Sequence, residues 1–197
     1  MIAYYKDVIA TIEDSLESID EKLYEQIIEE CIETIKNGGK IIASGLGKNV
    51  PICEKFVGTL NSLGIDARFL HTNTAVHGDL GIVGKNDIVF LLSKGGNTYE
   101  TVALAEYLKQ RHANTWLLTF KNECKSAEIV EKRLVLRLLN EGDEWNIVPN
   151  NSTSVYLILL QGIALGLAKS IGVTLEDFKV NHPGGGIGAM LSGRDLW

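Results

Sequence analysis

Short runs of β-forming apolar residues alternate with helical stretches along the middle of this chain, and this alternation constrains the fold more than any other feature. Nearly continuous apolar strands separated by helices are typical of a parallel sheet that is covered on both faces. The predicted strands are residues 40–44, 67–71, 87–93, 114–120 and 133–139. The predicted helices between them are residues 50–63, 98–110 and 124–132. The sequence therefore predicts an α/β domain.

The two ends of the chain are predicted to be helical. Residues 1–37 form two acidic amphipathic stretches without a cationic start or an unbroken apolar core, so we expect a helical hairpin rather than an export signal. The apolar run 155–168 is interrupted by Gln161, Gly162 and Gly166 and falls short of the roughly 18 apolar residues of a membrane span. We expect a buried helix there and no membrane partner. One domain over residues 1–197, with its core at 38–191, accounts for the chain.

Composition excludes several classes of protein. The formal net charge is −6 with no run of Lys or Arg, which argues against nucleic acid as a partner. The three cysteines, Cys31, Cys53 and Cys124, are scattered and lack CxxC spacing. They predict neither a disulfide framework nor a zinc site, so a cytoplasmic protein is expected.

Two glycine-bearing turns and one hydroxyl cluster lie where predicted strands give way to helices. They are residues 44–49, 93–98 and 149–154. Free N–H groups and the helix dipole favour phosphate at helix N-termini. Each turn taken alone could be an ordinary N-cap. The third glycine of a dinucleotide fingerprint would fall at Val50, and neither turn has Walker spacing, so no nucleotide cofactor is predicted. Together the turns predict a site for a monophosphate.

The segment 181–188, Asn-His-Pro-Gly-Gly-Gly-Ile-Gly, places one histidine on a backbone with few side chains. His182 could reach a neighbouring crevice and exchange protons near neutral pH. A solvated C-terminal turn is the alternative, and the segment alone does not separate the two.

Five motifs resemble, in order, the signatures of the sugar isomerase (SIS) domain family: SGLGK, LHTNTAVHGDLG, LLSKGGNTYET, EGDEWNIVPNNSTS and NHPGGGIG. The likeness runs from about Gly38 to Leu191 and is nearest to the arabinose-5-phosphate isomerases, without the CBS modules of longer members. It implies a three-layer α/β/α sandwich with a five-stranded parallel sheet. It also implies cytoplasmic sugar-phosphate chemistry and a homotetramer with active sites shared between subunits.

The resemblance assigns roles to residues of this chain. It implies that Lys48, Glu100, Glu141 and His182 are catalytic. The implied substrate-binding residues are Ser44, Gly45, Gly47, His71, His77, Ser93, Gly96, Asn97, Thr98, Ser152 and Thr153. The chain departs from the family where relatives read S-N-S-G-E: Lys94 adds a cation, Gly95 replaces a serine and Asn97 replaces an acid. A cysteine-containing stretch after Glu141 is replaced by residues 142–146.

The implied reaction is metal-independent interconversion of an aldose and a ketose phosphate, most simply D-arabinose 5-phosphate and D-ribulose 5-phosphate. Moving a proton between C1 and C2 through an enediol requires a base, for which a carboxylate serves, and a donor that stabilises oxygen charge. His71 and His77 lack a third ligand, so no metal site is predicted. Two alternatives remain: a non-catalytic phosphosugar sensor, and an SIS isomerase for a hexose or hexulose phosphate.

Overall fold

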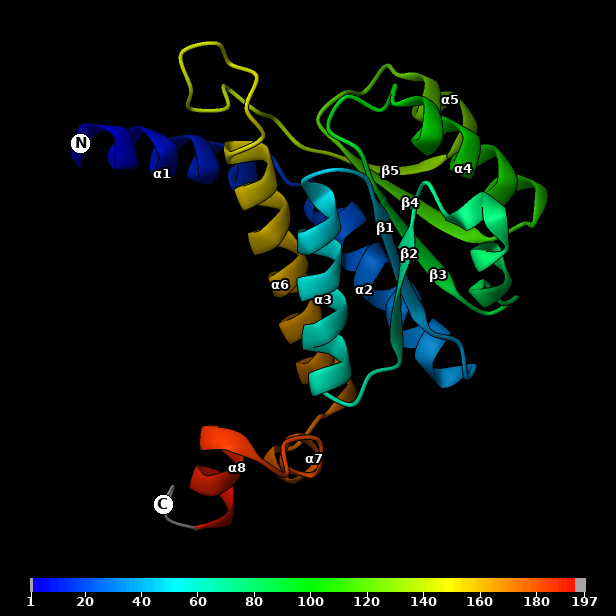
Figure 1. The fold of residues 1–197 in the computed structure, drawn as a ribbon, viewed down its shortest axis with the longest axis vertical. Helices are drawn as coiled ribbons and strands as arrows, with labels where there is room; N and C mark the ends of the chain where they lie inside the picture. Colours follow the sequence, from blue (N-terminus) through cyan, green and yellow to red (C-terminus); the bar gives the residue numbers. More distant parts are fainter. Residues whose placement is uncertain (1, 194–197) are drawn as a thin grey trace.

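Five parallel strands form one sheet at the centre of the chain in the computed structural model, which describes residues 2–193 (Figure 1). The strands are β1 (Ile41–Gly45), β2 (Ala67–His71), β3 (Ile88–Leu92), β4 (Asn114–Thr119) and β5 (Lys132–Val135). They are ordered β2-β1-β3-β4-β5 across the sheet, and every neighbouring pair is parallel. The predicted five-stranded parallel sheet is confirmed.

Both faces of the sheet are buried, as the near-continuous apolar strands predict. Ile88, Phe90 and Leu92 of β3 belong to the larger core cluster. Val89 and Leu91, which point the other way along the strand, belong to a second cluster. Helices therefore cover the sheet on both sides, and the three-layer α/β/α architecture is confirmed.

The larger layer contains α1 (Ile2–Glu17), α2 (Glu21–Lys36), α3 (Asn49–Ser62) and α6 (Asn151–Ile171). The predicted N-terminal hairpin is thus present. Glu30 of α2 fastens it to the sheet, since its carboxylate accepts hydrogen bonds from Trp116 Nε1 (2.8 Å) and Asn114 Nδ2 (3.0 Å) and pairs with Lys132 Nζ at 2.9 Å. By length and composition alone α6 would suit a membrane span, but 44% of its most apolar window is buried, and it packs against α3 as a core helix.

The opposite layer contains α4 (Tyr99–Gln110), α5 (Lys125–Ile129) and the short 3₁₀ helices η1 (Ala75–His77) and η2 (Asp79–Ile82). Here α5 is shorter than the predicted helix 124–132. Its last turn ends at Val130, whose backbone is already extended, and Lys132 begins β5.

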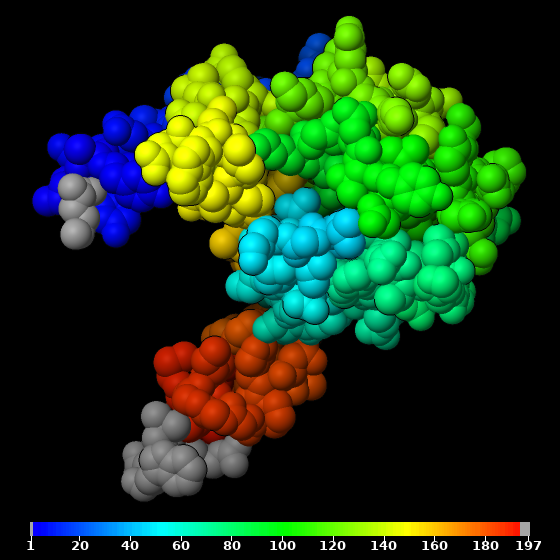
Figure 2. Space-filling view, turned by 45° about the horizontal axis from the view of Figure 1, so that its top comes forward, coloured from blue at the N-terminus to red at the C-terminus, as the bar shows by residue number. Residues whose placement is uncertain are grey.

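The C-terminal helices α7 (Leu175–Val180) and α8 (Gly185–Ser192) lie apart from the two layers, beyond the end of α6 (Figures 1 and 2). A capping box between Thr174 and Asp177 starts α7. Asn181 Nδ2 contacts the Ser62 carbonyl at 3.4 Å, so this segment meets the body of the chain at the C-terminal end of α3.

Candidate active site

The turns identified in the sequence meet at one edge of the sheet. Gly45 of β1 pairs in register with His71 of β2 and with Leu92 of β3, so the three strands end side by side. Asn49 Nδ2, in the first turn of α3, reaches the Leu92 carbonyl at 3.4 Å. In open α/β sheets ligands bind beyond the carboxyl ends of the strands, which is where these turns lie. Figure 2 shows the cyan, green and yellow segments grouped around a hollow in the surface.

The turn after β1 is built on a close backbone approach. A Cβ atom on Gly45 would lie 2.8 Å from Asn49 Cβ and 3.1 Å from Cys53 Sγ, so no larger residue fits without a shift. Ser44 is buried, and its hydroxyl lies 3.0 Å from the Thr72 hydroxyl. Gly47 has a φ of +61°. Lys48 stands exposed at the N-cap of α3.

The turn after β3 leads into α4. Ser93 is buried, and its hydroxyl accepts a hydrogen bond from the Gly96 N–H at 3.1 Å. The Asn97 side chain accepts from the Lys125 N–H at 2.9 Å and so starts α5. Thr98 is the N-cap of α4 and makes no side-chain capping bond, while Glu100 lies in the first turn of that helix. The turn therefore directs Asn97 toward α5 and leaves the Thr98 hydroxyl at the helix N-terminus.

Glu141 is the most enclosed acid of this edge, with 0% of its surface exposed. Its Oε1 accepts from the Ser152 hydroxyl at 2.7 Å and pairs with Lys94 Nζ at 2.5 Å. Its Oε2 accepts from the backbone N–H groups of Ser152 (2.9 Å) and Asn150 (3.1 Å). The carboxylate thus satisfies two of the free N–H groups at the start of α6 and connects the turn after β3 to that helix.

The environment of Glu141 holds it as an anion. Burial raises the pKa of this carboxyl, but the hydrogen bonds from Lys94, Ser152 and Asn150 outweigh that effect, and its pKa lies below the usual value. Burial alone would raise the pKa of a carboxyl group toward neutral pH. The free protein therefore holds Glu141 as a carboxylate whose acceptor positions are occupied by four donors.

Other predicted substrate residues surround this pair. Thr153 follows Ser152, and its hydroxyl donates to the Asn150 carbonyl at 2.9 Å. His71 ends β2, where its Nδ1 accepts from the Asn73 N–H at 3.3 Å. His77 is exposed in η1. Within residues 2–193 no group of three His, Cys, Asp or Glu side chains is arranged to hold a metal ion.

His182 lies at the other end of the molecule. Its Nε2 is 2.8 Å from the Ser62 hydroxyl, its Nδ1 is 2.7 Å from the Phe178 carbonyl, and its ring stacks on Phe178. Ser62 is the last residue of α3, and Lys48 is the N-cap of that helix. At 1.5 Å per residue the helix separates them by roughly 20 Å. Within one chain, the structure does not bring His182 to the other three predicted catalytic residues.

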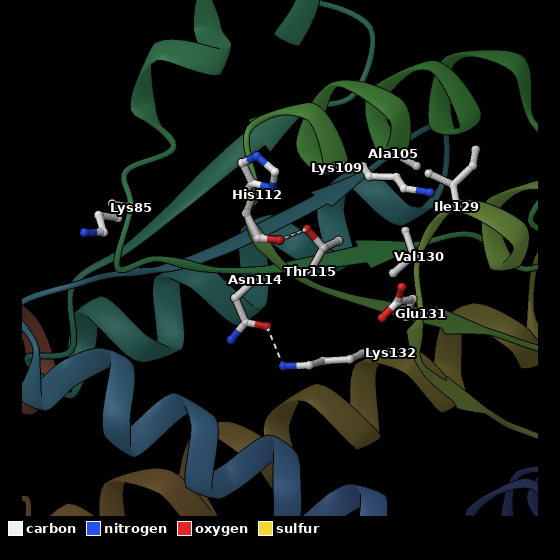
Figure 3. Close-up of a pocket in the computed structure, with 11 residues that line it drawn as sticks. Lys85, Ala105, Lys109, His112, Asn114, Thr115, Ile129, Val130, Glu131 and Lys132 are labelled. Atoms are coloured by element: carbon white, nitrogen blue, oxygen red, sulfur yellow. Dashed lines mark hydrogen bonds between the residues drawn. The ribbon is translucent and has the colours of Figure 1, made fainter.

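A cavity of about 470 Å³ lies at the opposite edge of the sheet, where β4 and β5 begin (Figure 3). Its lining includes the cations Lys85, Lys109 and Lys132, two of which serve the local structure. Lys132 binds Asn114 and Glu30, and Lys109 is in the last turn of α4, where a cation complements the helix dipole. The described strands begin at this edge, and the glycine turns follow their other ends, so we place the candidate site at the carboxyl edge.

Gly96 makes the turn after β3 possible, and its replacement provides a prediction about stability. Its φ is +65°, and an added Cβ would overlap Cys124 Sγ and lie 2.8 Å from Cys124 Cβ. We expect Gly96→Ala to lower the free energy of unfolding by roughly 2–4 kcal/mol, from backbone strain and overpacking together. Gly95→Ala is the matched control, because nothing lies within 4 Å of its added Cβ. Urea unfolding measures both; equal losses in the two variants would contradict the packing argument.

Sequence reasoning noted Lys94 as an added cation but did not place it among the site residues, and it assigned no role to Asn150. Lys94 contacts Glu141, which lies much further along the chain, and Asn150 offers its backbone N–H to the same carboxylate. The one signal in the sequence for a role of Lys94 was its place as a cation in a glycine-bearing turn at the end of a strand. The backbone contact from Asn150 has no signature in a single sequence.

The chain belongs to the SIS domain family, whose domain matches residues 34–168. The arabinose 5-phosphate isomerase KdsD of Shigella flexneri is 31% identical over 186 residues, which cover 94% of this chain and 57% of that protein. The Pseudomonas aeruginosa protein of the same name is 32% identical over 178 residues, covering 90% of this chain and 55% of that protein. This chain thus spans just over half the length of these curated relatives.

A solved structure agrees with this placement. The Escherichia coli CFT073 protein c3406, in complex with arabinose 5-phosphate, matches with a TM-score of 0.85 and 28% identity, covering 91% of this chain and 94% of that one. The family assignment made from the motifs is therefore confirmed.

Proposed function

We propose that this protein is a metal-independent aldose–ketose isomerase of a phosphosugar, most specifically of D-arabinose 5-phosphate and D-ribulose 5-phosphate. The observation that carries the proposal is the buried, ion-paired Glu141 carboxylate at the edge where two glycine turns open helices. The relatives named arabinose 5-phosphate isomerase, and the related structure in complex with arabinose 5-phosphate, support this class of substrate.

The chemistry assigns a role to each group. A carboxylate, Glu141 in this proposal, takes the proton from C2 of the open-chain aldose. The C–H electrons form the C1–C2 double bond of an enediol while the carbonyl oxygen at C1 gains a proton. Returning the proton to C1 and releasing the O2 proton gives the ketose, so atoms and electrons balance without an oxidant. Lys48 stabilises the developing oxygen charge, His182 moves protons during ring opening, and Glu100 orients Lys48.

We place the phosphate at the start of α4. Thr98 starts this helix without a side-chain capping bond, and the first backbone N–H groups of a helix have no partner within it. We propose that the phosphate binds against these groups, with Ser93 and Thr153 nearby. Because Ser152 donates its hydroxyl to Glu141, it contributes through that carboxylate rather than through the phosphate.

A direct assay tests the proposal. Purified protein in D₂O should interconvert the two pentose phosphates and wash solvent deuterium into C2 of the aldose, and chelator should not abolish turnover. A panel that includes hexose and hexulose phosphates identifies the sugar. Turnover of a hexulose phosphate alone would reassign the substrate, and no turnover of any of them would reject the isomerase.

A phosphosugar sensor is the second candidate, and one observation favours it. All four acceptor positions of Glu141 are filled by donors of its own chain, as in a structural carboxylate. A sensor would bind pentose phosphate by calorimetry and leave its C2 proton unexchanged, which separates it from the enzyme in the same set of measurements.

We further propose a cytoplasmic homotetramer in which a neighbouring subunit donates His182. The roughly 20 Å between the ends of α3 supports this arrangement, because His182 of the same chain is too far from Lys48 to share a substrate with it. The exposed apolar residues of α7 and α8, Leu175, Val180, Ile187 and Met190, also suit burial against another subunit.

A further inference from the structure

Lys94 stands between Glu141 and the solvent. Its side chain is 40% exposed, whereas the Glu141 side chain that it contacts at 2.5 Å is fully buried. A base must come within hydrogen-bond reach of the proton it removes. A ligand that approaches Glu141 from the exposed side of Lys94 therefore meets the ammonium before it meets the carboxylate.

The four donors to Glu141 differ in how easily they can leave. The N–H groups of Asn150 and Ser152 belong to the backbone at the start of α6, and the Ser152 hydroxyl is buried with its residue. Lys94 is the one long and partly exposed side chain among them. A carboxylate has about four acceptor positions. Glu141 can take a proton in its present setting only if one donor withdraws, and Lys94 is the donor free to do so.

The position of Lys94 in the chain offers its ammonium a second anion. It lies in the turn between β3 and α4, which ends at the Thr98 N-cap where we place the substrate phosphate. An ammonium has three N–H donors, and within residues 2–193 Glu141 is the one acidic side chain paired with Lys94. A phosphate ester carries a charge of about −1.5 to −2 at pH 7 and competes well for a cation held by a single carboxylate.

We propose that Lys94 is a positioning residue that covers and neutralises Glu141 in the free protein, and that the substrate phosphate draws its ammonium away and frees the carboxylate. The proposal rests on the proposed function, since it takes Glu141 as the base and a phosphosugar as the ligand. Binding then activates the base only when a substrate is present. Space for the lysine to move is open on the side of Gly95, where an added Cβ would meet nothing within 4 Å.

The charged groups around Glu141 determine in which direction its pKa moves when Lys94 withdraws. Besides Lys94, Tyr156 of α6 interacts electrostatically with Glu141, the Tyr4 hydroxyl of α1 accepts from Asn150 Nδ2 at 3.3 Å, and Asp143 and Glu144 belong to the same loop as Glu141. Burial raises the pKa of Tyr156 well above its usual value, so it stays neutral. The Asp143 carboxylate binds backbone N–H groups of its own loop. Withdrawal of Lys94 therefore removes the cation that lowers the pKa of Glu141 and leaves burial to raise it.

Inorganic phosphate tests the first half of the proposal without any turnover. Phosphate binding is measured by calorimetry in wild type and in Lys94→Met, Lys94→Arg and Lys85→Met. We expect Lys94→Met to weaken binding about tenfold and Lys94→Arg to retain most of it. Lys85 is exposed at the far edge of the sheet, so Lys85→Met removes the same charge without effect. Unchanged phosphate binding in Lys94→Met would overturn the proposal.

A ¹³C NMR titration of Glu141 tests the second half. The signal is assigned by its loss in Glu141→Gln and followed with pH, with and without saturating phosphate. In wild type we expect phosphate to raise the apparent pKa of Glu141 by about one unit. In Lys94→Met we expect the pKa of Glu141 to be higher than in wild type before phosphate is added, and phosphate should not change it further. A pKa that phosphate leaves unchanged in wild type would contradict the release of Glu141. Because neither experiment needs turnover, a failed isomerase assay and a failed role for Lys94 are distinguishable.

Discussion

Glu141→Gln is expected to lower kcat for pentose-phosphate isomerisation by about 10²–10⁴-fold while KM changes much less. In the proposed mechanism the carboxylate accepts the substrate proton only in the transition state, and a carboxamide cannot take that proton. The same change disturbs the fold, because Oε1 and Oε2 of Glu141 both face donors and an amide nitrogen would face one of them. We expect a loss of about 1–3 kcal/mol in the free energy of unfolding. Steady-state kinetics and urea unfolding, measured on the same preparation, separate the two effects.

The control for this experiment is Glu106→Gln, which neutralises an exposed acid on α4. It should leave kcat, KM and unfolding unchanged. A folded Glu141→Gln protein with wild-type kcat would refute the assignment of Glu141 as the base. Glu100, in the first turn of α4, would then be the next carboxylate to test.

The five strands could be predicted because each is a short apolar, β-forming run in the sequence. Their ends could not be predicted where contacts with residues distant in the sequence determine them. The strand predicted at 67–71 is β2, with the same bounds. The strand predicted at 133–139 ends at Val135, because the chain beyond it is held by other elements. Arg137 donates its N–H to the Ser18 hydroxyl at 2.9 Å and pairs with Asp14, both at the corner between α1 and α2. Contacts with residues near the other end of the sequence overrode the β-forming pattern.

The candidate site shows the same division. The motifs placed Lys48, Glu100 and Glu141 at the carboxyl edge of one sheet because strand–turn–helix units are local and parallel strands align their ends. Their roles stay predictions. The Lys94–Glu141 ion pair could not be predicted from the sequence. The direction of the lysine side chain depends on the loop that carries Glu141, which lies much further along the chain. The position of His182 beside Ser62 likewise depends on the path of the whole of α6 and α7.

Mixing two inactive variants is expected to restore activity if His182 acts in the site of a neighbouring subunit. His182→Asn should fold and assemble, because its ring contacts Ser62 at the end of α3 and Phe178 of α7, away from the core, and yet it should lose most turnover. Glu141→Gln should lose turnover for a different reason, because it lacks the proposed base. In a randomly mixed oligomer, about one quarter of the shared sites combine an intact Glu141 with an intact His182 from the other chain. We therefore expect the mixture to regain a substantial fraction of wild-type activity after subunit exchange.

The mixing experiment gives a different result if each active site uses the His182 of its own chain. If each site used its own His182, every site in the mixture would keep one defect and activity would stay at the level of the single variants. Exchange itself is verified by native mass spectrometry of differently labelled chains, so a negative result cannot come from unmixed oligomers. A control mixture of His182→Asn with His182→Asn,Glu141→Gln double-variant chains should remain inactive, because no chain in it supplies the histidine. A fully active monomer, or verified exchange without rescue, would refute the shared site, and the roughly 20 Å along α3 would then have to be closed by movement of α7 and α8 within one chain.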